Sequence, residues 1–303
     1  MYSSRTNQMN LSSKQLSSHS KNPNEKFALV VQFSHVVGDG ATYYKLMHYL
    51  CSDVEIEQLI PERIHNSDEL QREVMGESEA NYLSSFGFTS MGIVGMIENQ
   101  VKRVLPYEYS FLDESKNKSI ETVKVHAAKM SGLEYVSTND ILVSHLMQNS
   151  ISEYGLMAIN WRDRLPGHTK LHVGNYENTI FYYPEDYSSP GLIRRSILLG
   201  GESSYKRHVT CESKPFPSWY RVVTTPTTLV TNWITFAKPN HIKGCTEELH
   251  IPLVLDKLCI SHRLRMFILF RAGPNGKIGL LYPPDAMNVG FKSNPFAGLY
   301  LVL

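Results

Sequence analysis

The sequence predicts a mixed fold of the α/β or α+β class. Helix-like and strand-like segments are mixed along the chain, and its last third is mostly strand-like. The chain has 303 residues, of which 42% are hydrophobic and 19% are charged. It is therefore long enough for one large or two medium domains, and it can bury a sizeable core.

The first part of the chain is predicted to begin with a tail and a buried strand. Residues 1–25 are polar and poor in apolar side chains, which is typical of a disordered tail. Phe27–Phe33 has the dense apolar character of a buried strand. Residues 106–119 are charged and turn-rich, and we expect a crossover loop there. Between these segments, helices are expected at residues 41–51, 69–83 and 90–105.

The rest of the chain is predicted to contain most of the strands. Residues 120–128 fit either a strand or a helix. Helices are expected at residues 139–149 and 191–199, the first with Thr138 or Asn139 as its N-cap. Strands are expected at residues 156–161, 178–183, 227–236, 265–271 and 277–282. The last two flank Ala272–Gly276, whose Asn-Gly pair accepts positive φ and therefore predicts a β-hairpin.

Composition excludes several classes of function. The formal net charge is +1 without a basic block, and because phosphate backbones bind clustered Lys and Arg, nucleic acid is not an expected partner. No apolar run approaches the roughly 18 residues that span a bilayer, so no transmembrane segment is expected. The cysteines, at positions 51, 211, 245 and 259, form no CxxC pair. This pattern favours free thiols in a reducing compartment, and we expect the cytoplasm.

The most informative run of the chain is Phe33–Gly40, which reads F-S-H-V-V-G-D-G. It places His35 where the expected strand gives way to the expected helix, and a side chain at such a point can reach a cleft. A neutral imidazole accepts a proton near neutral pH and returns it later in the same cycle. His35 is therefore a candidate general base.

Asp39 follows the histidine by four positions and is the second candidate residue of this run. Its carboxylate can form an ion pair with an arginine that the sequence does not identify, or it can cap the helix that follows. Gly38 and Gly40 allow tight turns and leave room for a ligand. An N-cap aspartate beside an incidental histidine is the alternative interpretation, because three fixed residues recur by chance.

Three further stretches follow in a fixed order. Ser137–Ser144 reads S-T-N-D-I-L-V-S, Asn160–Pro166 reads N-W-R-D-R-L-P before Gly174-Asn175, and Thr231–Trp233 reads T-N-W. With the HxxxDG run, they resemble the motifs of the CoA-dependent acyltransferase superfamily, namely HxxxDG, S-T-x-D-x-L-x-A, x-x-R-x-R-L-x-P…G-N and T-S-W. That superfamily contains the plant-type alcohol and amine acyltransferases (the BAHD family), chloramphenicol acetyltransferase and the peptide-synthetase condensation domains.

The resemblance implies a chloramphenicol acetyltransferase-like two-domain sandwich with His35 at the interface between the domains. It also implies that His35 takes the proton of an acceptor hydroxyl or amine while the acceptor attacks the thioester of an acyl-CoA. The tetrahedral oxyanion is stabilised by hydrogen-bond donors, and no acyl-enzyme forms. Acyl-CoA is then a co-substrate held in a tunnel, and no cofactor is needed. The implied partners are acyl-CoA and a small-molecule alcohol or amine, and we expect a monomer.

The resemblance also assigns roles to residues around the base. Asp39 is expected to be structural and to point away from the substrates. Thr231 and Trp233 match the T-S-W positions, so the hydroxyl or the indole N–H is a candidate donor to the oxyanion. Framework or substrate-binding roles are expected for Gly40, Arg162 and Arg164. For the two arginines, ordinary surface charges are the alternative interpretation.

Two departures from the family pattern lead to further expectations. Only 34 residues precede His35, so we expect an incomplete N-terminal domain and weak or no acyl transfer by this chain. The expected organisation is a tail at 1–25, a partial N-terminal domain with HxxxDG at 26–110 and a C-terminal domain at 111–303. After Trp233 the chain lacks the D-F-G-W-G motif of the plant-type branch, which argues against that branch.

The sequence is also compatible with two other functions. One is a catalytically impaired relative that keeps the fold and binds a ligand or partner. Another is a condensation-type domain that uses carrier-bound thioesters, although that branch favours a second histidine where Ser34 stands. No metal site is expected, because His168 and His172 lack an acidic partner and the pair of His35 with Asp39 lacks a third ligand.

Overall fold

The structure is a computed structural model that describes residues 26–51, 53–85, 107–112, 117–198, 205–253 and 264–299. The chain divides into two compact units, residues 1–32 and residues 33–303. The described residues of the first unit, 26–32, form neither helix nor strand. All helices and strands named below belong to the second unit.

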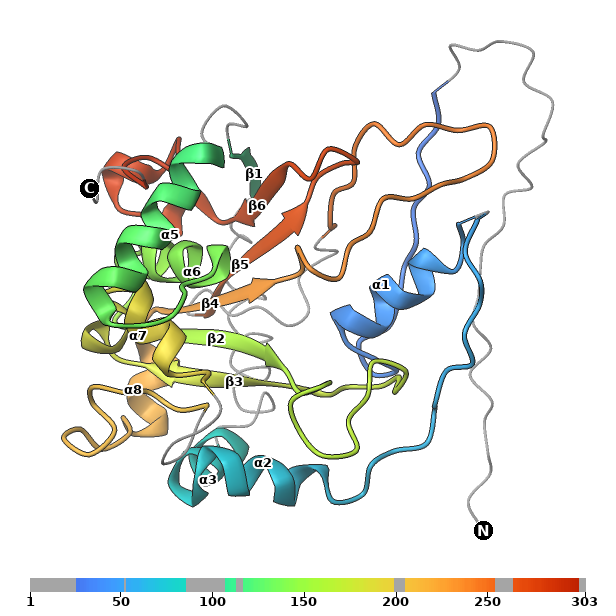
Figure 1. The fold of residues 1–303 in the computed structure, drawn as a ribbon. Coiled ribbons are helices and arrows are strands. Elements are labelled where there is room, and N and C mark those ends of the chain that lie inside the picture. Colours follow the sequence, from blue (N-terminus) through green and yellow to red (C-terminus); the bar gives the residue numbers. More distant parts are fainter. Residues whose placement is uncertain are drawn as a thin grey trace. The chain divides into compact units, whose positions relative to one another are not determined.

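A mixed sheet runs through the second unit (Figure 1), and in the described residues it has six strands in the order β1-β6-β5-β4-β2-β3. β4 pairs in parallel with β2 and with β5, whereas the other neighbouring strands are antiparallel. The predicted mixed class is therefore confirmed. The strands are β1 (Glu108–Phe111), β2 (Tyr154–Asn160), β3 (Glu177–Tyr182), β4 (Thr227–Asn232), β5 (Leu264–Arg271) and β6 (Ile278–Tyr282).

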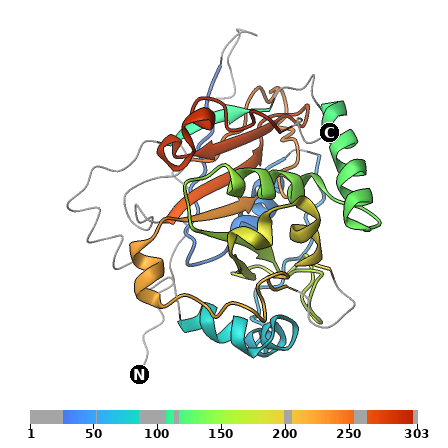
Figure 2. The same cartoon turned by 90° about the vertical axis from the view of Figure 1, so that its left-hand side faces the viewer.

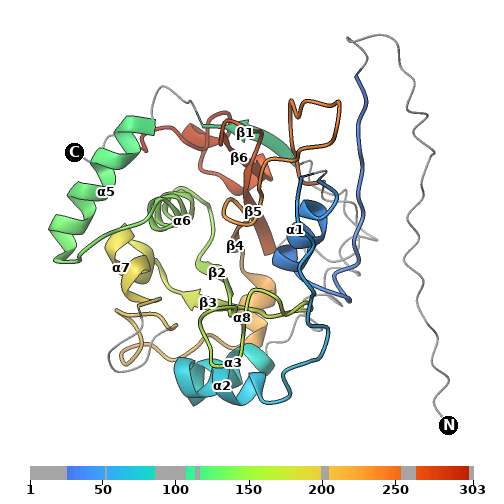
Figure 3. The ribbon, with the colours of Figure 1, turned by 45° about the vertical axis from the view of Figure 1, so that its right-hand side comes forward.

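Three helices form a layer on one face of the sheet. α5, α6 and α7 contact one another, and α6 also contacts β4. Figure 2 looks onto this layer, and Figure 3 shows α1 on the other side of β4 and β5. The helices are α1 (Gly40–His48), α2 (Ser67–Met75), α3 (Glu77–Ser85), α5 (Asn117–Ser131), α6 (Thr138–Gln148), α7 (Pro190–Arg195) and α8 (Trp219–Thr224). Short 3₁₀ turns are η2 (Pro184–Tyr187), η3 (Pro284–Ala286) and η4 (Val289–Phe291).

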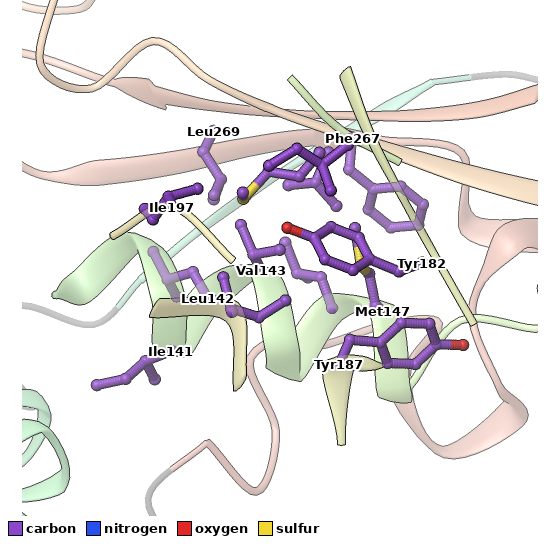
Figure 4. Close-up of a cluster of buried hydrophobic side chains, with 14 of the residues drawn as sticks. Ile141, Leu142, Val143, Met147, Tyr182, Tyr187, Ile197, Phe267 and Leu269 are labelled. Carbon is purple, nitrogen blue, oxygen red and sulfur yellow. The ribbon is translucent and has the colours of Figure 1, made fainter. Parts of the chain in front are cut away.

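The main core lies between this helical layer and the sheet. It is the cluster of buried side chains that includes Leu142 of α6, Tyr182 of β3 and Phe267 of β5 (Figure 4). On β4, Val230 belongs to the main core, whereas Leu229 packs in a separate cluster on the opposite face. Successive side chains of a strand point to opposite faces, so the central strands are covered on both sides. Strands of this kind read as continuous apolar runs, which is why they could be predicted.

The strand predicted at Phe27–Phe33 is wrong. Residues 26–34 form neither helix nor strand, and Phe27, Leu29 and Val30 are exposed. An apolar run becomes a strand only when a neighbouring strand accepts its hydrogen bonds. None of the described strands pairs with this segment.

Two further predictions of elements require correction. Residues 106–119 were expected to be a loop, yet they contain β1 and the first residues of α5. The helix predicted at 69–83 is two helices, α2 and α3. Gly76 lies between them with φ of 85°, a left-handed value that ends the first helix.

The N-cap of α6 is Ser137 rather than Thr138 or Asn139. The Ser137 hydroxyl accepts from the N–H of Asp140, and the Asp140 carboxylate accepts from the N–H of Ser137 at 2.7 Å. This reciprocal arrangement is a capping box. A run of three polar residues allowed several caps, and only Ser137 has the aspartate three positions later that completes the box.

The other predicted elements within the described residues are confirmed, with ends shifted by a few positions. Residues 120–128 are helical and belong to α5. β5 and β6 form the predicted hairpin, and Gly276 in its turn has φ of 75°. The tail predicted at 1–25 and the helix predicted at 90–105 lie outside the described residues. The predicted domain boundaries stay predictions.

No helix among the described residues combines the length and the apolar character that crossing a membrane requires.

Candidate functional site

The segment from His35 to Asp39 is a turn that leads directly into α1. Inside it, the N–H of Val37 donates to the carbonyl of Ser34 at 3.0 Å. Asp39 is the N-cap of α1, since its backbone is extended and its Oδ1 accepts from the N–H of Thr42 at 2.9 Å. An aspartate in this position satisfies a helix N–H that would otherwise lack a partner.

Asp39 also forms a buried ion pair with Arg162. Nη1 of the arginine is 2.8 Å from Oδ2 of the aspartate, and the two side chains are 4% and 2% exposed. The other acceptors of the guanidinium are the side chains of Asn160 and Thr42 and the carbonyl groups of His172 and Gly174. Each of its five N–H groups therefore has an acceptor, which is the condition for burying such a charge without a large penalty.

The environment keeps Asp39 ionised. Burial acts to raise the pKa of its carboxyl group. The hydrogen bond and the charge of Arg162, together with the N–H groups of Thr42 and Tyr176, outweigh burial and lower the pKa below its ordinary value. These donors hold the carboxylate in its charged form, and the structural role expected for Asp39 stays a prediction.

Residues 174–177 run beside the HxxxDG turn and contact it at each position. The carbonyl group of Gly174 accepts from the N–H of Asp39 at 3.1 Å. The remaining contacts are Asn175 Nδ2 to the carbonyl of His35 (2.8 Å), the N–H of Tyr176 to Asp39 Oδ2 (2.9 Å), and Glu177 Oε1 to His35 Nε2 (3.0 Å). This segment therefore positions both residues of the motif.

His35 presents its side chain at the surface of the second unit. Its side chain is 71% exposed and that of its partner Glu177 is 34% exposed. The hydrogen bond with Glu177 is the largest influence and raises the pKa of His35, burial acts to lower it, and the net pKa lies above the ordinary value. An imidazole here can exchange a proton with a bound molecule, provided that it first becomes neutral.

Trp233 lies against the first residue of α1. A Cβ added to Gly40 would lie 3.1 Å from Nε1 and 3.3 Å from Cε2 of this tryptophan. The indole Nε1–H donates to Oγ1 of Thr231 at 3.0 Å. The structure thus brings the T-N-W segment to the HxxxDG segment. Because the indole N–H is occupied, the hydroxyl of Thr231 is the donor that this pair can offer.

The two predicted arginines do not share a site. Arg162 is the arginine that pairs with Asp39, a partner that the sequence did not identify. Arg164 lies over the ring of Tyr205, with 5.6 Å between the guanidinium carbon and the ring centroid. A second buried pair involves the S-T-N-D segment, where Arg194 Nη2 is 2.6 Å from Asp140 Oδ2.

The histidines weighed as metal ligands have other partners. His168 is buried, with its Nε2 2.9 Å from Ser67 Oγ and its Nδ1 3.0 Å from the carbonyl of Pro166. His172 Nδ1 bonds to Thr169. In the part of the chain that the structure describes, no three His, Cys, Asp or Glu side chains gather as a metal site would require.

Sequence reasoning missed three contributors to the site. Thr42 is buried, and its hydroxyl links Arg162 to Gly174. Tyr176 caps the Asp39 carboxylate from the backbone, and Glu177 binds the imidazole. Only the nearby G-N pair of residues 174 and 175 carried a signal, because it belongs to the family pattern. Residues that meet only through a long-range contact carry no local sequence motif that would identify them.

No family model matches the sequence, and no curated protein is similar enough to count as a match. Solved structures do match. They include VibH, an NRPS condensation enzyme (TM-score 0.42, 12% identity, 88% of this chain and 65% of that chain). Vinorine synthase matches with a TM-score of 0.48 and 13% identity, over 86% of this chain and 60% of that chain. Polyketide synthase associated protein 5 from Mycobacterium tuberculosis matches with a TM-score of 0.44 and 10% identity, over 88% of this chain and 70% of that chain.

This chain spans less than two thirds of the length of VibH and of vinorine synthase. The TM-scores are below 0.5 and the identities do not exceed 13%. The functional proposal therefore rests on the residues of the site itself.

Proposed function

We propose that this chain transfers an acyl group from an acyl-CoA thioester to the hydroxyl or amino group of a small acceptor. His35 removes the acceptor's proton as the acceptor oxygen or nitrogen attacks the thioester carbonyl. A tetrahedral oxyanion forms, the carbon–sulfur bond breaks, and the departing thiolate takes the proton from His35. The acyl group passes directly between the two substrates, and the reaction uses no metal.

The observation that carries the proposal is the way His35 is presented. Its loop is fixed by a fully hydrogen-bonded, buried ion pair between Asp39 and Arg162. The side chain itself is 71% exposed and can reach a bound molecule. A rigid backbone beneath an accessible imidazole is what a general base requires, because the proton must be met at a defined distance and angle.

The proposed donor to the oxyanion is the hydroxyl of Thr231. It accepts from the indole of Trp233, which lies against Gly40 of the same motif. Accepting a hydrogen bond polarises a hydroxyl and makes it a better donor. A donor held in this way is already oriented when negative charge develops on the thioester oxygen.

The test is a thiol-release assay with a panel of acyl-CoAs and a panel of alcohols and amines, with the product identified by mass spectrometry. We expect slow thiol release that depends on the acceptor and matches the acylated product in amount. A matched reaction with His35→Gln reports the uncatalysed background. A folded wild-type chain that gives no acylated product with any pair would contradict acyl transfer.

The same assay separates the other two functions. Transfer only from a thioester on a carrier protein would identify a condensation-type domain. Saturable binding of an acyl-CoA without product would identify a catalytically impaired, ligand-binding relative.

We further propose a reducing compartment such as the cytoplasm, since Cys51, Cys211 and Cys245 are free thiols.

A further inference from the structure

The proposed base has a partner that the mechanism above does not use. Glu177 is the first residue of β3, and its Oε1 lies 3.0 Å from Nε2 of His35. Two positions earlier, Asn175 binds the carbonyl group of the same histidine. In extended chain, residues two apart point to the same side. One short segment therefore holds both the backbone and the side chain of His35.

Among the described residues, the charged groups that act on the imidazole come from two elements. Glu177 belongs to β3, and Asp39 is the N-cap of α1. The charge of Asp39 is directed to Arg162, 2.8 Å away, so it acts on the imidazole only through space. Glu177 is therefore the carboxylate in direct contact with His35.

The ring of His35 faces a carboxylate. Its Nε2 lies 3.0 Å from Oε1 of Glu177, and this contact is the largest influence that raises the pKa of the imidazole. A carboxylate beside an imidazole favours the charged, proton-donating form of the ring. The pairing with Glu177 therefore favours the imidazolium, which cannot accept a proton from an acceptor substrate, over the neutral ring.

We propose that Glu177 is a positioning residue that controls the protonation of His35 and thereby sets the pH window in which this chain transfers acyl groups. The proposal rests on the proposed function, because the pH window presupposes that His35 is the base. Transfer needs the neutral imidazole, so the rate rises with pH as His35 loses its proton. Without the Glu177 carboxylate, the neutral imidazole becomes available at lower pH.

The first part of the test does not require activity. The His35 ring is titrated by NMR in protein labelled at its histidines, and its signal is identified by its loss in His35→Gln. We expect Glu177→Gln to titrate at lower pH than the wild type. The matched control is Glu153→Gln, because Glu153 is also paired and exposed but precedes β2. Since Asn160 pairs with Glu177 across the sheet, Glu153 lies at the opposite end of β2.

The second part measures thiol release against pH for the wild type, Glu177→Gln and Glu153→Gln. We expect the rising limb for Glu177→Gln to move to lower pH, so that this variant is faster than the wild type below the wild-type inflection. Glu153→Gln should follow the wild type. A residue that only supports the fold would lower the rate at every pH and leave the inflection in place.

The outcomes separate the two proposals. An unchanged His35 titration in a folded Glu177→Gln protein overturns the role of Glu177, whatever the activity. A shifted titration in a wild-type chain that transfers no acyl group supports the pairing and overturns the proposed function. A shifted titration together with an unshifted rate profile overturns the link between Glu177 and the pH window.

Discussion

A single arginine determines the geometry of the HxxxDG turn. Arg162 is 123 positions away from Asp39 in sequence, yet it bonds this carboxylate and four further acceptors at once. Its planar fork of donors can satisfy acceptors that lie in different directions. A lysine has three donors at one point and could not replace it. The loop conformation is therefore specified by a long-range contact.

Replacing the proposed base should affect the reaction and leave the fold intact. His35→Ala removes a side chain that is 71% exposed and lies outside the buried ion pair. We expect turnover to fall by about 10²-fold or more, the usual effect of losing a general base, with an unchanged melting temperature. Steady-state thiol release and thermal melting measure the two quantities. Near-normal turnover would remove His35 from the mechanism.

Replacing its neighbour Asp39 should mainly cost stability. Asp39→Asn keeps a capping side chain but leaves Arg162 as a buried charge without its partner. We expect a loss of about 3–5 kcal/mol in the free energy of unfolding, measured with urea at neutral pH. The matched control is Asp163→Asn, whose exposed pair with Lys170 should contribute about 0.5 kcal/mol or less.

The sign of the pH effect follows from the lowered pKa of Asp39. Its stabilisation is present above the ordinary pKa of a carboxyl group and is lost as pH falls through the lowered pKa. The wild type should therefore approach the stability of Asp39→Asn in acid. If melting is unchanged in the variant while its pH–rate profile shifts, Asp39 takes part in proton transfer instead.

At the residue scale, the sequence identified the side chains that belong to a motif and missed those that only complete it. His35 and Asp39 stand in a short pattern with a chemical meaning. Glu177 belongs to no such pattern, and in the sequence it cannot be told apart from an ordinary surface glutamate. Its role depends on β3 lying beside the turn, and that is a property of the fold.

At the scale of elements, the start of α1 depends on the close contact between Gly40 and Trp233. A methyl group at position 40 would lie 3.1 Å from the indole nitrogen, so the indole or the helix must shift. We expect Gly40→Ala to break the hydrogen bond from Trp233 Nε1 to Thr231 Oγ1 and to lower turnover by about 10-fold or more. Thiol release and near-ultraviolet circular dichroism would record both effects.

A second glycine provides the control for this prediction. Gly290 has no atom within 4 Å of the position that a Cβ would occupy. Gly290→Ala should therefore leave turnover and the tryptophan signal unchanged. Full activity in Gly40→Ala would show that the T-N-W segment does not act on the motif.

α3 carries a buried carboxyl group whose environment makes stability depend on pH. Glu79 is buried, its oxygens have no hydrogen-bond donor within the described residues, and Arg207 Nε is 3.6 Å away. Burial is the largest influence and raises the pKa of Glu79 to about 7, although the charge of Arg207 acts to lower it. The unfolded chain loses this proton at lower pH, so native stability falls as pH rises from the ordinary pKa through 7.

Glu79→Gln should abolish this pH dependence. We expect the wild type to lose about 3 kcal/mol relative to the variant between acidic and mildly alkaline pH, as a shift of this size implies. Urea unfolding of both proteins at the two pH values measures the difference. Parallel pH dependence in the two proteins would show that Arg207 compensates the charge of Glu79 completely.

The elements that could be predicted are those with a local cause. The hairpin between β5 and β6 has its Asn-Gly turn, and α6 follows a run of polar capping residues, although its N-cap is Ser137. β1 was missed because its four residues, E-Y-S-F, are mostly exposed and form a strand only by pairing with β6. Phe27–Phe33 failed for the opposite reason, since its apolar pattern predicts a strand but its residues form neither helix nor strand.

At the scale of the whole molecule, the order of the strands was beyond sequence reasoning. β1 pairs with β6, about 170 positions later in the chain, and β4 lies between two strands that are distant from each other in sequence. The main core reflects this topology. Met75 of α2 belongs to the same cluster as Phe267 of β5 and Phe296 near the end of the chain.

This shared core leads to a prediction about cooperativity. Met75 is 0% exposed, so Met75→Ala should leave a cavity and cost about 2–5 kcal/mol. Because the cluster that contains Met75 draws its residues from both halves of the chain, we expect one unfolding transition that moves as a whole, by fluorescence and by circular dichroism alike. Met130→Ala, at a position that is 73% exposed, is the matched control and should change little. The contrary result would be two unfolding transitions, of which only the first shifts in Met75→Ala. It would indicate that residues 26–110 unfold as a separate domain.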